Sequence, residues 1–120
     1  MRAEGEFFIL RSLELTENGF AAAAELLPEH PVYAGHFPQQ AVVPGVCTLT
    51  VVRECAEKYL GRSISFATIA ECKFLSALLP CKGLVVNMDF AVTGSSLSGT
   101  VSRADDGRTV MKLKASIKDR

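Results

Sequence analysis

The sequence predicts an α+β domain in which an antiparallel sheet of five or six strands curls around one long central helix. Three observations lead to this prediction. Strand-like stretches stand on both sides of a single helical stretch, that helical stretch is apolar around most of its circumference, and the residues after it alternate between apolar and polar. A helix that is apolar on most sides needs cover on most sides, which a curled sheet supplies. Since 120 residues suffice for one core but not for two, residues 1–120 are expected to form a single domain.

A β-hairpin is expected first. Residues 6–15 form a strand-like stretch, the Asn18-Gly19 pair supplies a tight-turn signal, and a second strand runs over residues 20–27. The alanine run inside this second stretch favours a helix by propensity alone. The turn before it and Pro28 after it favour a strand, so we predict the hairpin.

The long helix is predicted at residues 46–60, about four turns, with Gly61 as its C-cap. Its charged side chains gather on one stripe, at spacings of four residues that allow ion pairs. These residues are Arg53, Glu54, Glu57 and Lys58. We expect this stripe to face solvent, with Arg53 paired to Glu57 and Glu54 paired to Lys58.

Alternation with a period of two predicts the strands after the helix. In the stretch around residues 84–93 the apolar face holds Leu84, Val86, Met88, Phe90 and Val92, and the polar face holds Asn87, Asp89 and Thr93. Residues 97–103 repeat the pattern more weakly, and Asp106-Gly107 indicates a hairpin into the last strand. In that strand Met111, Leu113, Ala115 and Ile117 are expected to face inward, opposite Lys112, Lys114, Ser116 and Lys118.

Composition argues against several classes of function. Lysine plus arginine balance aspartate plus glutamate at 13 each and tryptophan is absent, so neither net charge nor a stacking platform indicates nucleic-acid binding. No signal peptide or membrane-spanning run is recognisable, and we expect a cytoplasmic protein. The cysteines lack the spacing of a metal or redox site and are expected to be reduced, buried, small apolar side chains. They are Cys47, Cys55, Cys72 and Cys81.

The region from residue 28 to residue 45, dense in Pro, Gly and His, is expected to be a long ordered loop of the kind in which binding residues concentrate. His36 places in this loop an imidazole that can titrate near neutral pH. Pro44-Gly45-Val46 then opens the helix, whose first backbone N–H groups lack acceptors and carry a partial positive charge. This combination indicates proton transfer next to a polarised carbonyl group.

Two segments of the chain resemble a known family. The segment Gly35-His36-Phe37-Pro38-Gln39-Gln40-Ala41-Val42-Val43-Pro44-Gly45-Val46 resembles the active-site signature of the β-hydroxyacyl-(acyl carrier protein) dehydratases, enzymes of the hot-dog fold. Residues 69–82 are similar to the strand and turn that follow the family's central helix. With the matching order of elements, the resemblance covers nearly the whole chain. Gln40 and Leu78-Leu79-Pro80 are most similar to the small dehydratases of aryl-polyene pathways.

The resemblance implies a hot-dog dimer whose sheets join edge to edge, with two active sites at the interface. It implies that His36 is the base and faces the partner's central helix, and that Gly45 with Val46 forms the turn whose amide binds the thioester carbonyl. It also implies an acyl carrier protein or CoA thioester as substrate, a homodimer or higher homo-oligomer, and no metal or organic cofactor. The substrate-binding residues would be Phe37, Pro38, Pro44, Gly45, Val46 and Phe74, with Phe66 also lining the tunnel.

The chain departs from the family at the acid. Thr50 stands where the family has Glu or Asp, and a threonine hydroxyl supplies no ionisable proton at neutral pH. Three other positions also differ from the family's usual residues: Gln39, Ala41 and Cys81. Thr50 either positions the substrate's hydroxyl or a water, or simply bonds back to the preceding turn. Glu54, one turn later on about the same face, is either a displaced general acid or the ion-pair partner of Lys58.

We favour an enzyme, a hydro-lyase that converts 3-hydroxyacyl thioesters to trans-2-enoyl thioesters in biosynthesis of fatty-acid or other lipid type. Thr50 keeps two alternatives open: a thioesterase of the same fold, and a non-catalytic acyl-thioester-binding subunit that pairs with an active paralogue. Lys73 and Lys82 flank the second family-like segment and are expected to meet an acidic carrier protein. For the lysines of the last strand, a solvated face is the preferred interpretation over carrier docking.

Overall fold

The computed structural model describes residue 5 and residues 7–27, 45–79 and 81–120 of the chain. These residues form one helix and six strands, in the order β1 (Phe8–Leu15), β2 (Gly19–Leu26), α2 (Gly45–Leu60), β3 (Ile64–Phe74), β4 (Val85–Thr93), β5 (Ser96–Arg103) and β6 (Thr109–Asp119).

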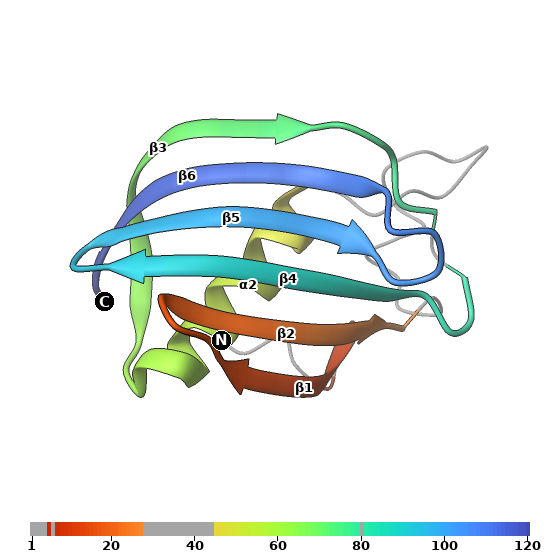
Figure 1. Ribbon diagram of the computed structural model, residues 1–120, viewed down its shortest axis with the longest axis horizontal. Coiled ribbons are helices and arrows are strands. Elements are labelled where there is room, and N and C mark those ends of the chain that lie inside the picture. Colours follow the sequence, from red (N-terminus) through yellow and green to blue (C-terminus); the bar gives the residue numbers. More distant parts are fainter. Residues whose placement is uncertain (1–4, 6, 28–44, 80) are drawn as a thin grey trace.

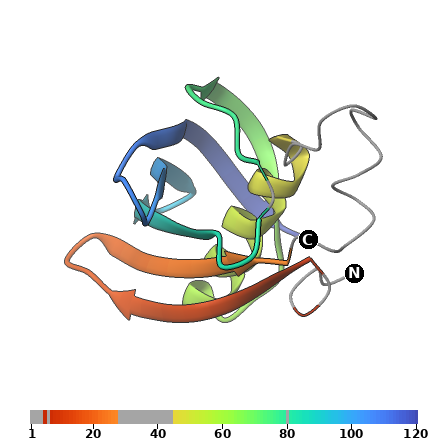
Figure 2. The same cartoon turned by 90° about the vertical axis from the view of Figure 1, so that its right-hand side faces the viewer.

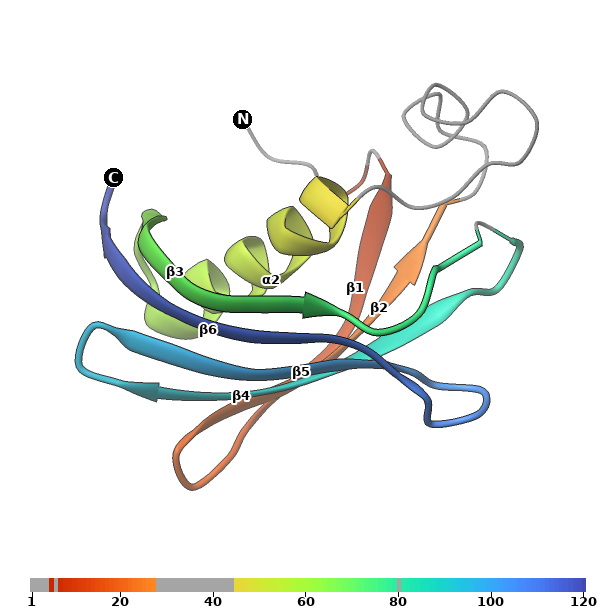
Figure 3. The ribbon, with the colours of Figure 1, turned by 90° about the horizontal axis from the view of Figure 1, so that it is seen from above.

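The six strands form a single sheet in the order β1-β2-β4-β5-β6-β3, with every neighbouring pair antiparallel (Figure 1). The sheet bends around α2, which lies on its concave side (Figure 3). An end-on view shows the strands enclosing the helix from more than one side (Figure 2). The predicted α+β architecture, one long helix wrapped by an antiparallel sheet, is confirmed.

β1 and β2 form the predicted hairpin. The backbone N–H of Thr16 donates to the carbonyl of Gly19 at 2.9 Å and closes the turn. The alanine run of β2 is extended because its alternate members fill the inner face of the sheet, where Ala22 and Ala24 are buried. Packing against the rest of the core therefore overrides the helical propensity of alanine.

α2 begins one residue before the predicted helix and ends where predicted, at Leu60. Gly61 has a φ of 74°, and its N–H donates to the carbonyl of Glu57 at 2.8 Å, so it is the C-cap. Val52 and Ala56 are fully buried, as a wrapped helix requires. In the described part of the chain, no helix is both long and apolar enough to cross a membrane.

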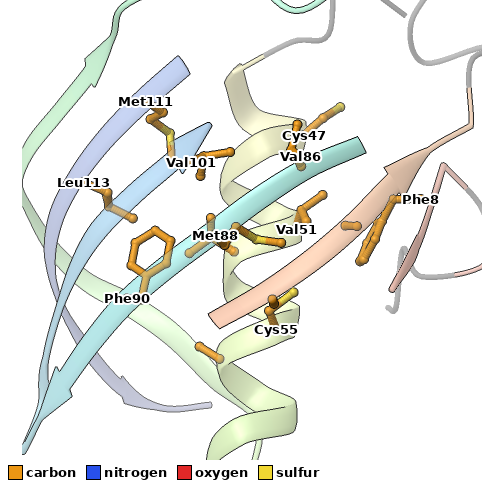
Figure 4. Packing of buried hydrophobic residues seen from close by; sticks show 14 of the residues in the cluster. Phe8, Cys47, Val51, Cys55, Val86, Met88, Phe90, Val101, Met111 and Leu113 are labelled. Carbon is orange, nitrogen blue, oxygen red and sulfur yellow. The ribbon is translucent and has the colours of Figure 1, made fainter. Parts of the chain in front are cut away.

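The core fills the space between α2 and the concave face of the sheet (Figure 4). The strands contribute alternate residues, as the period of two predicts. Leu84, just before β4, and Val86, Met88 and Phe90 of β4 are buried, and so are Met111, Leu113, Ala115 and Ile117 of β6. The lysines of β6 are exposed on the opposite face of the sheet. Since this outer face carries the charges of the strands, the sheet separates an apolar interior from a polar exterior.

The charged residues of α2 do not form a solvent-facing stripe, and this prediction is wrong at two positions. Glu54 is 1% exposed and Glu57 is 3% exposed. Glu57 accepts hydrogen bonds from the Arg53 guanidinium at 3.0 Å and from the backbone N–H of Ile64 at 2.9 Å, and Arg120 lies 3.4 Å away. Because Ile64 opens β3 and Arg120 follows β6, one carboxylate joins the end of the helix to two strands. Helical spacing correctly predicted the pairing of Arg53 with Glu57, but not its burial.

Candidate active site

The start of α2 is the electropositive end of a 16-residue helix. The first four N–H groups of any helix have no acceptor within it, and here they belong to Gly45, Val46, Cys47 and Thr48. The first turn contains no acidic side chain that would compete for them. Val46 is 65% exposed, so this end of the helix is accessible in the single chain. Such a helix start can hold a negatively charged oxygen or a polarised carbonyl.

Phe74, the last residue of β3, lies directly against Gly45. A β-carbon placed on Gly45 would lie 2.6 Å from the Cζ atom of the Phe74 ring, well inside van der Waals contact. The absence of a side chain at this position therefore lets the ring lie against the helix start. The ring remains 53% exposed, so it forms part of the surface beside the helix amides. The predicted role of Phe74 as a substrate-binding residue stays a prediction.

An open depression of about 360 Å³ lies beside the start of the helix. Its described lining is mostly apolar and consists of Gly45, Thr48, Phe74, Leu75, Ser76, Ala77, Leu78 and Val110. The segment after β3 is fixed to β6 by two hydrogen bonds. The Leu75 N–H donates to Val110 at 2.7 Å, and the Ser76 hydroxyl donates to the Thr109 carbonyl at 3.3 Å. An apolar chain could lie here with a carbonyl group directed at the helix amides.

Several of these lining residues were missed by the sequence prediction. Thr48 follows Gly45 by three residues, so helical geometry alone would have placed both on one face. Leu78 and Val110 gave no such signal, because their proximity depends on how the segment after β3 returns to β6. Phe66, which was expected to line the tunnel, is partly buried against the core and is not among the described residues that line this depression, so its place in a tunnel stays a prediction.

Thr50 and Glu54, the two candidates for the acid, have different surroundings. The Thr50 hydroxyl donates to the carbonyl of Val46 at 2.8 Å, which is the bond back to the preceding turn. This bond uses the hydroxyl's proton and leaves the oxygen able to accept. Glu54 is buried, and one of its carboxylate oxygens lies 3.6 Å from the Arg53 guanidinium. It lies about 6 Å further from the helix start than Thr50, at a rise of about 1.5 Å per residue.

The other predicted site residues lie outside the described part of the chain. These are His36, Phe37, Pro38 and Pro44. Their predicted roles as base and substrate contacts therefore stay predictions. The described residues of the site are the helix start and the depression beside it.

The cysteines follow the prediction only in part. Cys47 and Cys55 are buried, but Cys72 is partly exposed and Cys81 is exposed. Burial raises the pKa of the Cys47 thiol, which keeps it protonated although it lies near the helix start. Among the described residues, no group of three or more His, Cys, Asp or Glu side chains is arranged to hold a metal ion.

Comparison with known families decides the family of this chain. The family model described as ApeI-like, ApeI dehydratase, matches residues 12–112. The chain belongs to the ApeI-like dehydratase family. The resemblance to the hot-dog dehydratases that the sequence indicated is thereby confirmed.

Individual relatives of this ApeI-like chain agree with the assignment. The 3-hydroxyacyl-(acyl-carrier-protein) dehydratase FabZ of Streptococcus sanguinis is 26% identical over 106 residues, which cover 82% of this chain and 76% of the relative. Among solved structures, the dehydratase heterocomplex ApeI:P of Xenorhabdus doucetiae has a TM-score of 0.73 at 24% identity, covering 93% of this chain and 97% of that one. A hypothetical thioesterase with coenzyme A from Streptococcus pneumoniae has a TM-score of 0.60 at 11% identity, covering 97% and 91%. At these identities the two structures establish the hot-dog fold alone.

Proposed function

We propose that this ApeI-like protein is a dehydratase of 3-hydroxyacyl thioesters, carried by acyl carrier protein or CoA in biosynthesis of fatty-acid type. The observation that supports this most directly is the pairing of Gly45 with Phe74 beside an apolar depression of about 360 Å³. A thioester needs a donor for its carbonyl and an apolar surface for its acyl chain. The helix start and the depression supply these two features next to each other.

The helix amides would act on the carbonyl. Removal of the Cα proton shifts negative charge onto the thioester oxygen, and donors already in position stabilise that charge without reorganisation. The amides of Gly45 and Val46 are the candidates for these donors, supported by the positive end of α2. The exposed ring of Phe74 would exclude water from one side of the bound thioester.

His36 would take the Cα proton. A neutral imidazole with a pKa near the operating pH suits this step, in which the C–H bond breaks and a carbon–carbon double bond forms. The C3–O bond breaks at the same time, and the leaving hydroxide needs a proton to depart as water. That proton would come from His36 itself, from a water held by the Thr50 oxygen, or from Glu54. Protons balance on each route. If His36 itself returns the proton, the imidazole ends neutral. On the other two routes, the imidazolium gives its proton to solvent and the donor takes one from solvent before the next turnover.

A second copy of the chain would complete the site. β3 is an edge strand of the sheet and exposes Ile69 and Phe74. Unpaired edges of this kind readily pair with another strand. A homodimer joined at β3 would bring the depression of one protomer close to its partner, and higher homo-oligomers can be built from such dimers.

The second candidate function is a non-catalytic acyl-thioester-binding subunit. Two observations favour it: the Thr50 hydroxyl already donates to Val46, and a structural neighbour of this fold is described as a dehydratase heterocomplex. In that case an active paralogue would supply the acid. A thioesterase has less support, because the similarity to the thioesterase structure concerns the fold alone.

The test is one assay with two simultaneous readings. Purified protein is incubated with 3-hydroxyacyl thioesters of pantetheine and of acyl carrier protein, while enoyl absorbance and free thiol are followed together. A dehydratase raises the enoyl absorbance without thiol release. His36→Ala should then lose about 10²–10⁴-fold in rate, the usual contribution of a general base. Thiol release would instead identify a thioesterase. Tight acyl binding with neither signal, unchanged in His36→Ala, would identify the binding subunit.

A further inference from the structure

The outer face of the sheet carries one row of side chains with its charges sorted by sign. The strand register places one residue from each strand in this row. In sheet order they are Glu14, Ala21, Asp89, Thr100, Lys112 and Lys73. Both acids lie on the β1 side of the row and both lysines on the β3 side, although the chain as a whole has no net charge.

Like charges gather within this row. Lys112 and Lys73 stand directly opposite each other on β6 and β3, an arrangement that costs free energy in a sheet. On the acidic side Glu14 and Asp89 are two strands apart and lie on either side of Ala21. Lys73 has Glu71 at 3.5 Å, but neither the two acids nor Lys112 has an ion-pair partner among the described residues.

The acidic side of the row is also hollow. A shallow depression of about 440 Å³ lies over β1, β2, β4 and β5, because the side chains beneath it are small. Its described lining is Ser12, Glu14, Ala21, Ala22, Ala23, Asn87, Met88, Asp89, Thr100 and Ser102. This set contains two carboxylates, no lysine and no arginine. The lining combines alanine surface at Ala21 and Ala23 with hydroxyl and amide groups and two carboxylates. Such a mixed surface can accept a lysine, whose stem is apolar and whose tip is charged.

We infer that the outer face of the sheet binds a second copy of this chain, back to back, with Lys112 of each copy in the acidic depression of the other. A two-fold axis would run parallel to the strands, above the boundary between β4 and β5. It would place the fifth residue of the row in one copy over the second residue of the row in the other copy. Lys112 of one copy would then lie on Ala21 of the other, between Glu14 and Asp89. The contact is self-complementary, as a two-fold interface requires.

The face has the size for this contact. Figure 1 looks onto it, and the two longer extents of the molecule are 42 and 28 Å. A standard interface buries about 800 Å² per partner, which such a face can supply. The outer face is convex, because the sheet bends around α2 (Figure 3). The reach of lysine can bridge the separation that this curvature leaves.

The interface is independent of the catalytic proposal and of any pairing at the β3 edge. Backbone pairing at an edge depends little on salt, whereas an interface of lysines and carboxylates weakens as salt rises. The expected result is an assembly whose mass doubles with concentration at low ionic strength and returns to the smaller species at high ionic strength. Sedimentation velocity measures both species.

Charge reversal tests the pairing residue by residue. Lys112→Glu and Asp89→Lys should each weaken self-association about tenfold or more, corresponding to about 1.4 kcal/mol. A mixture of these two variants should associate again. The glutamate introduced at residue 112 of one copy then meets the lysine introduced at residue 89 of the other, and the second contact keeps Lys112 between Glu14 and Asp89. Lys118→Glu is the control, since it makes the same change on β6 outside the row and should leave self-association unchanged.

Three outcomes would overturn the inference. Wild-type protein could keep one mass at low salt up to high concentration, or the mixed variants could fail to associate. Alternatively, Lys112→Glu could weaken binding of acyl carrier protein while Asp89→Lys leaves self-association unaffected. That last result would assign the lysines to carrier docking.

Discussion

Replacing Thr50 with glutamate puts an acid at the position where the resemblance to the dehydratases implies one. The side chain is partly exposed on the first half of α2, so a larger residue does not have to enter the core. Thr50 is the sixth residue of the helix, and its α-carbon is about 7.5 Å along the axis from that of Gly45. A glutamate side chain there can extend back toward the helix start, where the thioester carbonyl would lie.

The change in stability can be bounded from the contacts. Thr50→Glu removes the hydrogen bond to the Val46 carbonyl, which is worth about 0.5–1.5 kcal/mol. It replaces threonine by a better helix former and adds a negative charge near the positive end of the helix, each worth a few tenths of a kcal/mol. These effects oppose each other, so the free energy of unfolding should change by less than about 1 kcal/mol.

The change in rate should be much larger. A positioned general acid commonly contributes about 10²–10⁴-fold, or about 3–5 kcal/mol of transition-state stabilisation. Thr50→Gln is the matched control, because it has the size of glutamate without the ionisable proton. Dehydration is measured by the rise in enoyl absorbance, and hydration of the enoyl thioester is measured by the fall in the same absorbance. If Thr50→Glu folds and binds acyl thioester like wild type but turns over no faster than Thr50→Gln, residue 50 does not face the leaving hydroxyl and the reasoning fails.

Two further predictions concern the buried carboxylate and the carrier protein. Glu57→Ala should lower the free energy of unfolding by about 3 kcal/mol in urea titrations, because it leaves Arg53 and a strand amide without their buried partner. Glu57→Gln should cost clearly less, and equal losses would contradict this account. Reversing the charges of Lys73 and Lys82 should weaken binding of acyl carrier protein and flatten its salt dependence, as fluorescence anisotropy can measure. A salt-independent affinity would exclude docking by these lysines.

Periodicity in the sequence predicted the fold because buried residues recur with the geometric period of each element, two residues in a strand and about 3.6 in a helix. The alternation in β4 and β6 and the uncharged sides of α2 each follow from one local rule, and the structure agrees with both. Those rules treat a charged side chain as one that faces solvent. They therefore failed at Glu57, which is buried because it meets the amide of Ile64 and the guanidinium of Arg120. These partners come from other elements, and no local pattern contains them.

In the candidate site, too, some features followed from local sequence patterns and others depended on distant elements. The start of the helix was predicted to within one residue, and the resemblance to the family suggested Phe74 as a substrate-binding residue. The close approach of Phe74 to Gly45 was not predicted, because it depends on where the end of β3 passes the helix. Strand alternation alone indicates that Asp89 and Lys112 each lie on the polar face of their strand. That they lie in one row across the sheet could be known only from the registers of β4, β5 and β6.

The position of β3 has a consequence for how the chain acquires its structure. β3 follows α2 directly, yet among the described strands it pairs only with β6, where Ile64 pairs with Asp119. During synthesis β3 emerges well before the strand that must hold it, so the sheet cannot close while β6 is still on the ribosome. Until β6 has been synthesised, the strands before it and the apolar helix therefore keep their inner surfaces exposed to solvent, a state prone to aggregation. Slowed synthesis of the segment between β3 and β6 should lower the yield of folded protein, even though no contact of the finished molecule is altered.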